Sequence, residues 1–193
     1  MTHRRDEFSV LVVCTGNICR SPVAERLFRA RVAPDLPVAA SSAGTLGLVG
    51  HPIDGPSALA LRELDGEPEG HAARRLTSDL VTGADLILPA QTSHRETILH
   101  TEPLVFRRAF TLREFGRLGA AADPVAGIVD PEALRGRVAE IAGQRGSAGR
   151  AVAGSDDIGD PFGASLDVAR TCAAQISAAV DAAIAVLGLS TRR

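Results

Sequence analysis

Two side chains with reactive chemistry, Cys14 and Arg20, lie six residues apart near the start of the chain. A cysteine thiolate is a strong nucleophile, and a planar guanidinium is suited to clamping two phosphate oxygens. If the intervening loop holds a tetrahedral oxyanion, a thiolate at its foot stands in line with phosphorus. The pair therefore indicates phosphoryl chemistry, provided that the neighbouring elements form an anion-binding loop.

The flanking sequence predicts such a loop between a strand and a helix. Residues 8–13 are mostly large and apolar, as in a strand buried on both faces, and a helical period follows. Ser21 is expected to cap that helix, with Pro22 at its first position. Free amides and the helix dipole then bind anions over the helix N-terminus and favour a thiolate there. Gly16 and Asn17 are suited to positive φ in the loop.

Thiolate attack on a phosphate ester leaves an alkoxide or phenoxide, so an acid must supply a proton. Three carboxylates near the end of the chain are candidates: Asp156, Asp157 and Asp160. The residues alone do not choose among them. Ser21 is a candidate donor to the Cys14 sulfur, in addition to its expected role as a cap.

The segment 13–22 reads VCTGNICRSP and resembles the signature loop of the low-molecular-weight protein-tyrosine phosphatases. The likeness extends over most of the chain. It implies that Cys14 is the nucleophile, that Arg20 and the loop amides bind the phosphate, and that a phosphocysteine forms. The family keeps its general acid in an Asp-Pro pair near the chain end, which Asp160 and Pro161 match. Pro161 would stiffen that loop and fix the angle of the carboxylate.

The same resemblance assigns further positions. The loop residues Thr15, Gly16, Asn17, Ile18 and Cys19 are expected to bind substrate. Phe162 stands where the family usually has Tyr or Trp, and it can stack on a phenyl ring. Ser21, Ser42 and His71 are expected to support the loop by hydrogen bonding, with His71 bonded to Asn17. The resemblance also implies a reversible disulfide between Cys14 and Cys19 under oxidation.

Composition narrows the class of protein. The 193 residues carry a net charge of −2, which argues against a nucleic-acid binder. All 21 basic residues are arginines, which indicates the codon bias of a GC-rich genome rather than a function. Three cysteines do not make a disulfide scaffold, and no cluster of ligands predicts a metal or other cofactor. Residues 1–7 lack the apolar core of a signal peptide, and no apolar run is long enough to span a bilayer. A cytoplasmic protein, monomeric or weakly dimeric, is expected.

Alternating strand and helix patterns predict an α/β fold, a single domain over residues 1–193. Its central sheet is expected to have four parallel strands, flanked by helices on both faces, over residues 8–13, 38–45, 84–89 and 104–110. Helices are expected at 57–64, 91–100, 111–118 (capped by Thr111) and 166–187, where Cys172 faces the core. Residues 120–155 are interpreted as an insertion with a helix over 131–144 and a mobile linker over 145–154.

The function predicted is hydrolysis of phosphotyrosine, or other aryl phosphate monoesters, by a bacterial-type enzyme. The resemblance suggests an autophosphorylated tyrosine kinase as partner and a link to exopolysaccharide export. One alternative is arsenate reductase, which shares the fold. Its thioredoxin-coupled version needs two further cysteines, whereas only Cys172 lies outside the loop; a version that uses a low-molecular-weight thiol needs only the nucleophile. A second alternative is a non-catalytic phosphoprotein-binding module.

Overall fold

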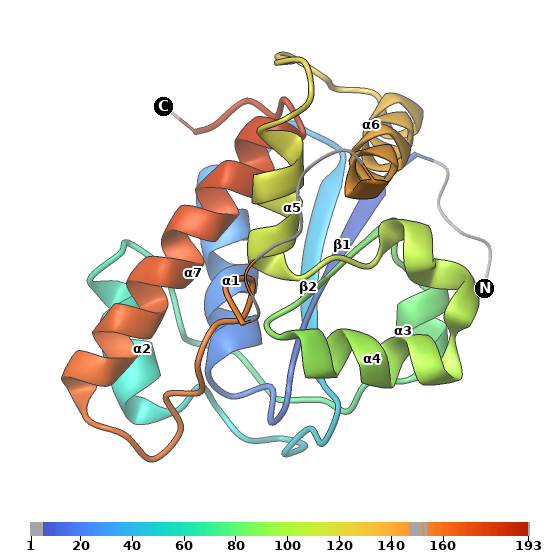
Figure 1. Cartoon of the computed structure of the whole chain (residues 1–193). Coiled ribbons are helices and arrows are strands. Elements are labelled where there is room, and N and C mark those ends of the chain that lie inside the picture. Colours follow the sequence, from blue (N-terminus) through green and yellow to red (C-terminus); the bar gives the residue numbers. More distant parts are fainter. Residues whose placement is uncertain (1–5, 147–151, 153, 193) are drawn as a thin grey trace.

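The computed structural model describes residues 6–146, 152 and 154–192. Within them, three parallel strands form a sheet in the order β2-β1-β3. β1 (Phe8–Cys14) is central and pairs over its full length with β2 (Val38–Gly44), and over Val10–Val13 with β3 (Leu86–Pro89). Figure 1 shows the strands running toward a common edge, where their carboxyl ends meet.

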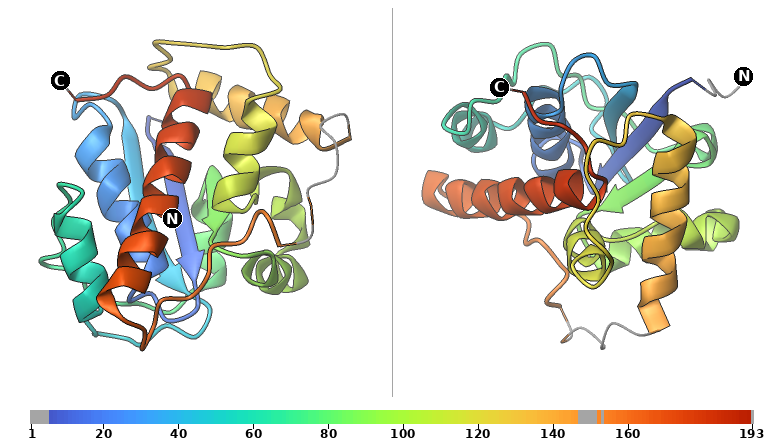
Figure 2. Two further views of the ribbon diagram at one scale, coloured as in Figure 1. Left: turned by 60° about the vertical axis from the view of Figure 1, so that its left-hand side comes forward. Right: turned by 90° about the horizontal axis from the view of Figure 1, so that it is seen from above.

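Helices cover both faces of the sheet, so the α/β class predicted from the sequence is confirmed (Figure 2). The helices are α1 (Arg20–Arg31), α2 (Gly55–Arg62), α3 (Ser78–Gly83), α4 (Thr92–Thr101), α5 (Leu112–Gly119), α6 (Pro131–Gly143) and α7 (Leu166–Val186). Short 3-10 turns follow α4 at η1 (Pro103–Arg108) and α6 at η2 (Gln144–Gly146).

Alternate residues of β1 face two different cores. Phe8, Val10 and Val12 pack in the larger core, to which α1, α2, α5, α6 and α7 contribute. Leu11 and Val13 pack with residues of α3, α4 and η1 on the opposite face. Every residue of β1 except Ser9 is buried, as expected for a central parallel strand. The strand therefore provides a rigid base for whatever follows Cys14.

The predicted fourth strand over residues 104–110 is wrong. Residues 103–108 form the 3-10 turn η1, and only Ala109 makes an isolated parallel bridge, to Ile87 of β3. Pro103 has no N–H to donate to a ladder and its fixed φ suits the start of a helical turn. The chain therefore meets the edge of the sheet at one residue and leaves it again through α5.

The start of α1 also differs from the prediction. The cap position is Cys19, and Ser21 and Pro22 are the second and third helical residues. Pro22 is tolerated there because first-turn amides have no intrahelical acceptor. Thr111 does cap α5, in a reciprocal capping box with Glu114.

In the region from residue 120 to 155, α6 and Arg145 both pack against the rest of the protein. α6 packs Leu134, Val138 and Ile141 into the larger core, as their spacing predicted. Arg145 lies with its guanidinium over the rings of Phe106 and Phe110, at 4.7 and 4.1 Å from the ring centroids. The rest of the predicted linker falls largely on residues 147–151 and 153, outside the described residues, as does most of the polar lead-in at 1–7.

No helix in the described parts of the chain combines the length and the apolar character needed to cross a membrane.

Candidate active site

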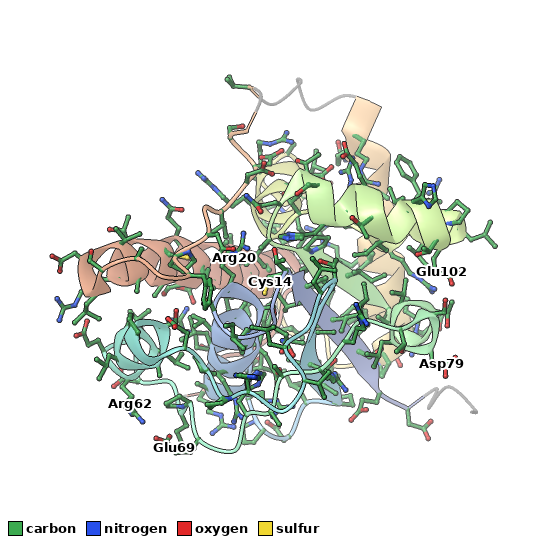
Figure 3. All side chains as sticks on the ribbon, turned by 90° about the horizontal axis from the view of Figure 1, so that it is seen from below. Cys14, Arg20, Arg62, Glu69, Asp79 and Glu102 are labelled. Atoms are coloured by element: carbon green, nitrogen blue, oxygen red, sulfur yellow. The ribbon has the colours of Figure 1, made fainter. Side chains whose placement is uncertain are left out.

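The loop from Thr15 to Cys19 joins β1 to α1 at the carboxyl edge of the sheet. Figure 3, which views that edge, places Cys14 and Arg20 together near its centre. Cys14 is the last residue of the central strand and Arg20 the first of the helix, and both are 2% exposed. The turn is sharp because Asn17 adopts φ +58° in the left-handed region. Sulfur and guanidinium are thus fixed at the two ends of one short loop.

Asn17 holds this loop in shape from behind. Its amide nitrogen donates to the hydroxyls of Ser21 and Ser42 at 2.9 and 2.8 Å, and its side-chain oxygen accepts from the backbone N–H of Arg74 at 2.8 Å. His71 Nε2 donates to its backbone oxygen at 2.7 Å. The buried amide therefore ties the loop to α1, to β2 and to the backbone at Arg74.

The Ser21 hydroxyl has a role that its position in the helix explains. It lies 3.0 Å from the Cys14 sulfur, accepts from Asn17, and can donate to the Ala43 carbonyl at 3.3 Å. A hydroxyl has a single proton, so it can turn from the carbonyl to the sulfur when Cys14 is a thiolate. The arrangement suits stabilisation of the thiolate by Ser21.

Ser42 continues the network to a residue that the sequence analysis missed. Its hydroxyl donates to the buried carboxylate of Glu25 at 2.5 Å, and Glu25 also pairs with Arg29 at 2.9 Å. Glu25 is 6% exposed on the buried face of α1, four residues after Ser21. An acidic residue on the apolar face of a helix was the signal that could have revealed it.

Asp160 reaches the loop from the segment before α7. Its carboxylate pairs with Arg20 Nη2 at 2.8 Å and is 46% exposed. Pro161 after it is buried, so the carboxylate sits on a fixed backbone at the edge of solvent. Arg20 also donates to the Ile158 carbonyl at 3.1 Å, which attaches this segment to the loop at a second point.

The other two acidic candidates are engaged elsewhere. Asp156 pairs with Arg117 of α5 at 2.7 Å. Asp157 accepts from the backbone N–H and the hydroxyl of Thr92 at 2.7 and 2.9 Å, at the start of α4. Both carboxylates therefore anchor the segment that precedes α7, and that also carries Asp160, to neighbouring helices. Of the three, Asp160 is the one placed against Arg20.

A cavity of about 210 Å³ opens above the loop. The residues that line it are Cys14, Thr15, Gly16, Ile18, Cys19, Arg20, Leu46, Leu48, Asp160 and Phe162. Asn17 is the member of the predicted binding set that does not line it. The exposed side chains of Phe162, Leu46 and Leu48 give the cavity apolar walls above a charged floor.

Leu46 and Leu48 of the cavity lining lie in the segment after β2, which is hydrogen-bonded to the loop. The N–H groups of Thr45, Leu46 and Leu48 donate to the carbonyls of Cys14, Thr15 and Gly16 at 2.9–3.0 Å. Gly44 makes this approach possible: a Cβ there would lie 2.4 Å from the Thr15 carbonyl oxygen. Glycine is required at this point by the closeness of the two backbones.

The two other cysteines, Cys19 and Cys172, are buried. Burial raises the pKa of Cys19 to about 12, against a smaller opposing effect of a hydrogen bond with Ser57. Burial likewise raises the pKa of Cys172 to about 11. Both are thiols rather than thiolates at neutral pH. Cys172 belongs to the larger core, as its place in α7 predicted.

The first residues of α4 supply contacts that sequence reasoning did not anticipate. Gln91 accepts from Arg20 Nη1 at 2.8 Å, and His94 Nε2 lies 2.9 Å from the Thr15 hydroxyl. Both follow the carboxyl end of β3, the edge at which ligands of parallel sheets bind, and that position was the available signal. Among the described residues, no group of three or more His, Cys, Asp or Glu side chains could hold a metal ion.

A thiol and an arginine in one strand–loop–helix turn, faced by a carboxylate, give this α/β protein a candidate cysteine-based phosphate site. The family model for low molecular weight phosphotyrosine protein phosphatases matches residues 9–142, and the chain belongs to this family. That match contains Cys14 and Arg20 but ends before Asp160, so the position of the acid rests on its contacts.

Known relatives agree with this family. The chain is 45% identical over 97 residues to the low molecular weight protein-tyrosine-phosphatase Etp of Escherichia coli K12, a match that spans 50% of this chain and 64% of Etp. It thus covers less than two thirds of that relative. The low molecular weight protein tyrosine phosphatase of T. tengcongensis superposes with a TM-score of 0.65 and 27% identity, over 92% of this chain and 98% of that one. The YwlE arginine phosphatase of Geobacillus stearothermophilus shares the fold at TM-score 0.66 and 24% identity, covering 91% and 89%.

Proposed function

We propose that this chain hydrolyses phosphotyrosine and related aryl phosphate monoesters through a phosphocysteine intermediate. The observation that carries the proposal is the Cys14 sulfur at the foot of a cavity whose floor holds Arg20 and Asp160, 2.8 Å apart. Family membership supports the same reaction. A catalytic role for each of the three residues is part of the proposal.

In the first step, the phosphate of the substrate takes the place of the Asp160 carboxylate on the Arg20 guanidinium. The phosphate anion beside Asp160 then favours the protonated carboxyl, which can act as an acid. The Cys14 thiolate attacks phosphorus, forming the S–P bond as the P–O bond to the leaving group breaks. Asp160 gives its proton to the departing oxygen, while Arg20 and the loop amides stabilise the equatorial oxygens.

In the second step, Asp160 is ionised and accepts a proton from water as the water attacks phosphorus. The S–P bond breaks, phosphate is released, and Cys14 leaves as a thiolate. The Ser21 hydroxyl, 3.0 Å from the sulfur, supports that thiolate as a hydrogen-bond donor. The thiolate and the protonated acid are both restored, and the reaction needs no oxidant or reductant.

The cavity walls favour an aromatic leaving group. Ile18, Leu46, Leu48 and Phe162 offer apolar contacts above the phosphate-binding floor, and Phe162 can stack on a phenyl ring. We propose a phosphotyrosine protein in the cytoplasm as the substrate, such as an autophosphorylated bacterial tyrosine kinase involved in exopolysaccharide export. Because the fold is shared with an arginine phosphatase, the fold alone does not choose the phosphorylated residue.

Steady-state hydrolysis of aryl phosphates with leaving groups of graded pKa tests the proposal. Cys14→Ser should abolish turnover, and Asp160→Ala should slow the poorest leaving groups most, because those need the proton most. Asp79→Ala serves as the matched control for Asp160→Ala, since Asp79 is exposed on α3 and lies at the periphery in Figure 3. This control should retain wild-type rates.

The alternatives have distinct outcomes in the same assay series. Hydrolysis of phosphoarginine peptides but not phosphotyrosine peptides would contradict the substrate class. Thiol consumption with arsenate, without aryl phosphate hydrolysis, would assign the chain to reduction of arsenate. Tight binding of a phosphotyrosine peptide without turnover would indicate a binding module.

A further inference from the structure

A histidine that has no part in the proposed reaction lies directly behind the phosphate-binding loop. His94, in the first turn of α4, is 6% exposed, and its Nε2 lies 2.9 Å from Oγ1 of Thr15. The same oxygen accepts a hydrogen bond from Nη2 of Arg20 at 3.3 Å. The Thr15 hydroxyl therefore links a buried imidazole to the guanidinium that binds phosphate.

The hydrogen-bonding groups decide which nitrogen of His94 carries the proton. A guanidinium can only donate, so Thr15 Oγ1 acts as an acceptor toward Arg20. Among the described residues, Nδ1 of His94 is buried and has no hydrogen-bond partner. A buried N–H without an acceptor is rarer than a buried acceptor without a donor. The proton therefore belongs on Nε2, which donates to Thr15.

We propose that His94 is a positioning residue for phosphate binding: as a neutral imidazole with its proton on Nε2, it fixes the Thr15 hydroxyl as an acceptor for Arg20. The guanidinium is then held in the orientation that receives phosphate. This proposal rests on the proposed phosphatase function, because it names a residue that supports the same site.

The surroundings of His94 keep it neutral. Burial, together with the positive charge of Arg20, lowers its pKa to about 4, while Asp160 and Asp157 act in the opposite direction with smaller effect. A neutral ring adds no second positive charge next to Arg20 at ordinary pH. α4 is itself fixed in place, since Asp157 accepts two hydrogen bonds from Thr92 at its first residue. The imidazole of His94, the hydroxyl of Thr15 and the guanidinium of Arg20 thus form one hydrogen-bonded network.

Four variants test this hydrogen-bonded network: His94→Leu, His94→Gln, Thr15→Val, and the double variant of His94→Leu with Thr15→Val. The readouts are kcat and KM for an aryl phosphate and, separately, the affinity for inorganic phosphate by calorimetry. His94→Leu should reduce phosphate affinity and kcat/KM by roughly tenfold, the usual order for losing one hydrogen bond in a buried site. His94→Gln, whose amide nitrogen can donate from the Nε2 position, should recover most of the loss.

The double variant is the decisive comparison. If His94 acts through Thr15, the double variant should lose no more phosphate affinity than the more impaired of the two single variants. Both changes then break the same link. His100→Leu is the matched control, since His100 is exposed on the same helix, and it should leave both readouts at the wild-type value. Melting temperatures show which variants remain folded, and Thr15→Val keeps the test available if His94→Leu does not fold.

Additive losses in the double variant, or a His94→Gln as impaired as His94→Leu, would overturn the proposal. Failure of the proposed function gives a different pattern. Suppose that the phosphate affinities of the wild type and the variants follow the predicted order, but the wild type hydrolyses no aryl phosphate. The role of His94 then stands and the phosphatase proposal falls. If the wild type binds no phosphate, the positioning role falls as well.

Discussion

Acid should destabilise this protein through His94. The ordinary pKa of a histidine is about 6.5, and burial beside Arg20 lowers that of His94 to about 4. As the pH falls below 6.5, the unfolded chain takes up a proton at this residue, whereas the folded chain does so only near pH 4. The unfolded state therefore binds more protons in this window, and stability falls with pH across it.

The magnitude follows from the difference between the two pKa values. A lowering from 6.5 to about 4 corresponds to roughly 3 kcal/mol of unfolding free energy, present above pH 6.5 and lost by about pH 4. His71, whose pKa is also lowered, chiefly by burial, adds a loss of the same sign. His94→Gln cannot titrate, so the difference between it and the wild type isolates the contribution of His94.

Urea unfolding at a series of pH values between 7 and 4.5 is the assay. The chain has no Trp or Tyr, so unfolding is followed by circular dichroism rather than by fluorescence. The wild type should lose about 2–3 kcal/mol more over this range than His94→Gln does. His100→Gln, on the exposed side of α4, should behave as the wild type does. Equal pH dependence in wild type and His94→Gln would refute the reasoning.

Three further changes have expected outcomes. Gly44→Ala places a Cβ 2.4 Å from the Thr15 carbonyl, so backbone must shift; we expect a loss of about 1–3 kcal/mol in urea unfolding and weaker binding in a phosphate titration, and unchanged values would contradict the close approach. Asn17→Gly and Asn17→Ala both remove the side-chain hydrogen bonds, but only glycine tolerates φ +58° without strain. Asn17→Ala should therefore be less stable than Asn17→Gly by about 1 kcal/mol in thermal unfolding, and the reverse order would argue against a left-handed residue here. Arg145→Met removes one of the two arginines paired with the buried Glu114, and a loss of about 1–3 kcal/mol should appear in chemical unfolding, whereas no loss would show that residue 145 is not docked in solution.

The strand–loop–helix turn that carries Cys14 and Arg20 could be predicted from sequence because its parts are close together in the chain. A buried strand, a loop with a residue suited to positive φ, and a helix start place Cys14 and Arg20 by local geometry alone. Asp160 lies 140 residues after Arg20, and only the Asp-Pro pair of the resembled family distinguished it from Asp156 and Asp157. Its contact with Arg20, and the engagement of the other two with Arg117 and Thr92, are tertiary facts.

The wrong predictions have physical reasons. Ser21 before a proline is typical of a cap, but here its hydroxyl is used by Cys14 and Asn17, and the helix begins at Arg20, two residues earlier than predicted. The apolar run at 104–110 suited a strand as well as a turn, and Pro103 with the bridge at Ala109 favoured the turn.

The residues that were missed share a different reason. Gln91, His94 and Glu25 are polar residues whose roles depend on which loop they contact. Sequence periodicity places them on a helix or at its start, but it does not show what they face.

The central claim is that phosphorus bonds to the sulfur of Cys14 during turnover. Rapid acid quench of the enzyme with an aryl phosphate, followed by peptide mass spectrometry, tests it most directly, and Asp160→Asn should slow the water step so that the intermediate accumulates. The account predicts one phosphoryl group on the peptide that contains Cys14, and none in Cys14→Ser or on Cys172. Turnover with no phosphorylated cysteine at any quench time, or phosphate on another residue, would contradict it.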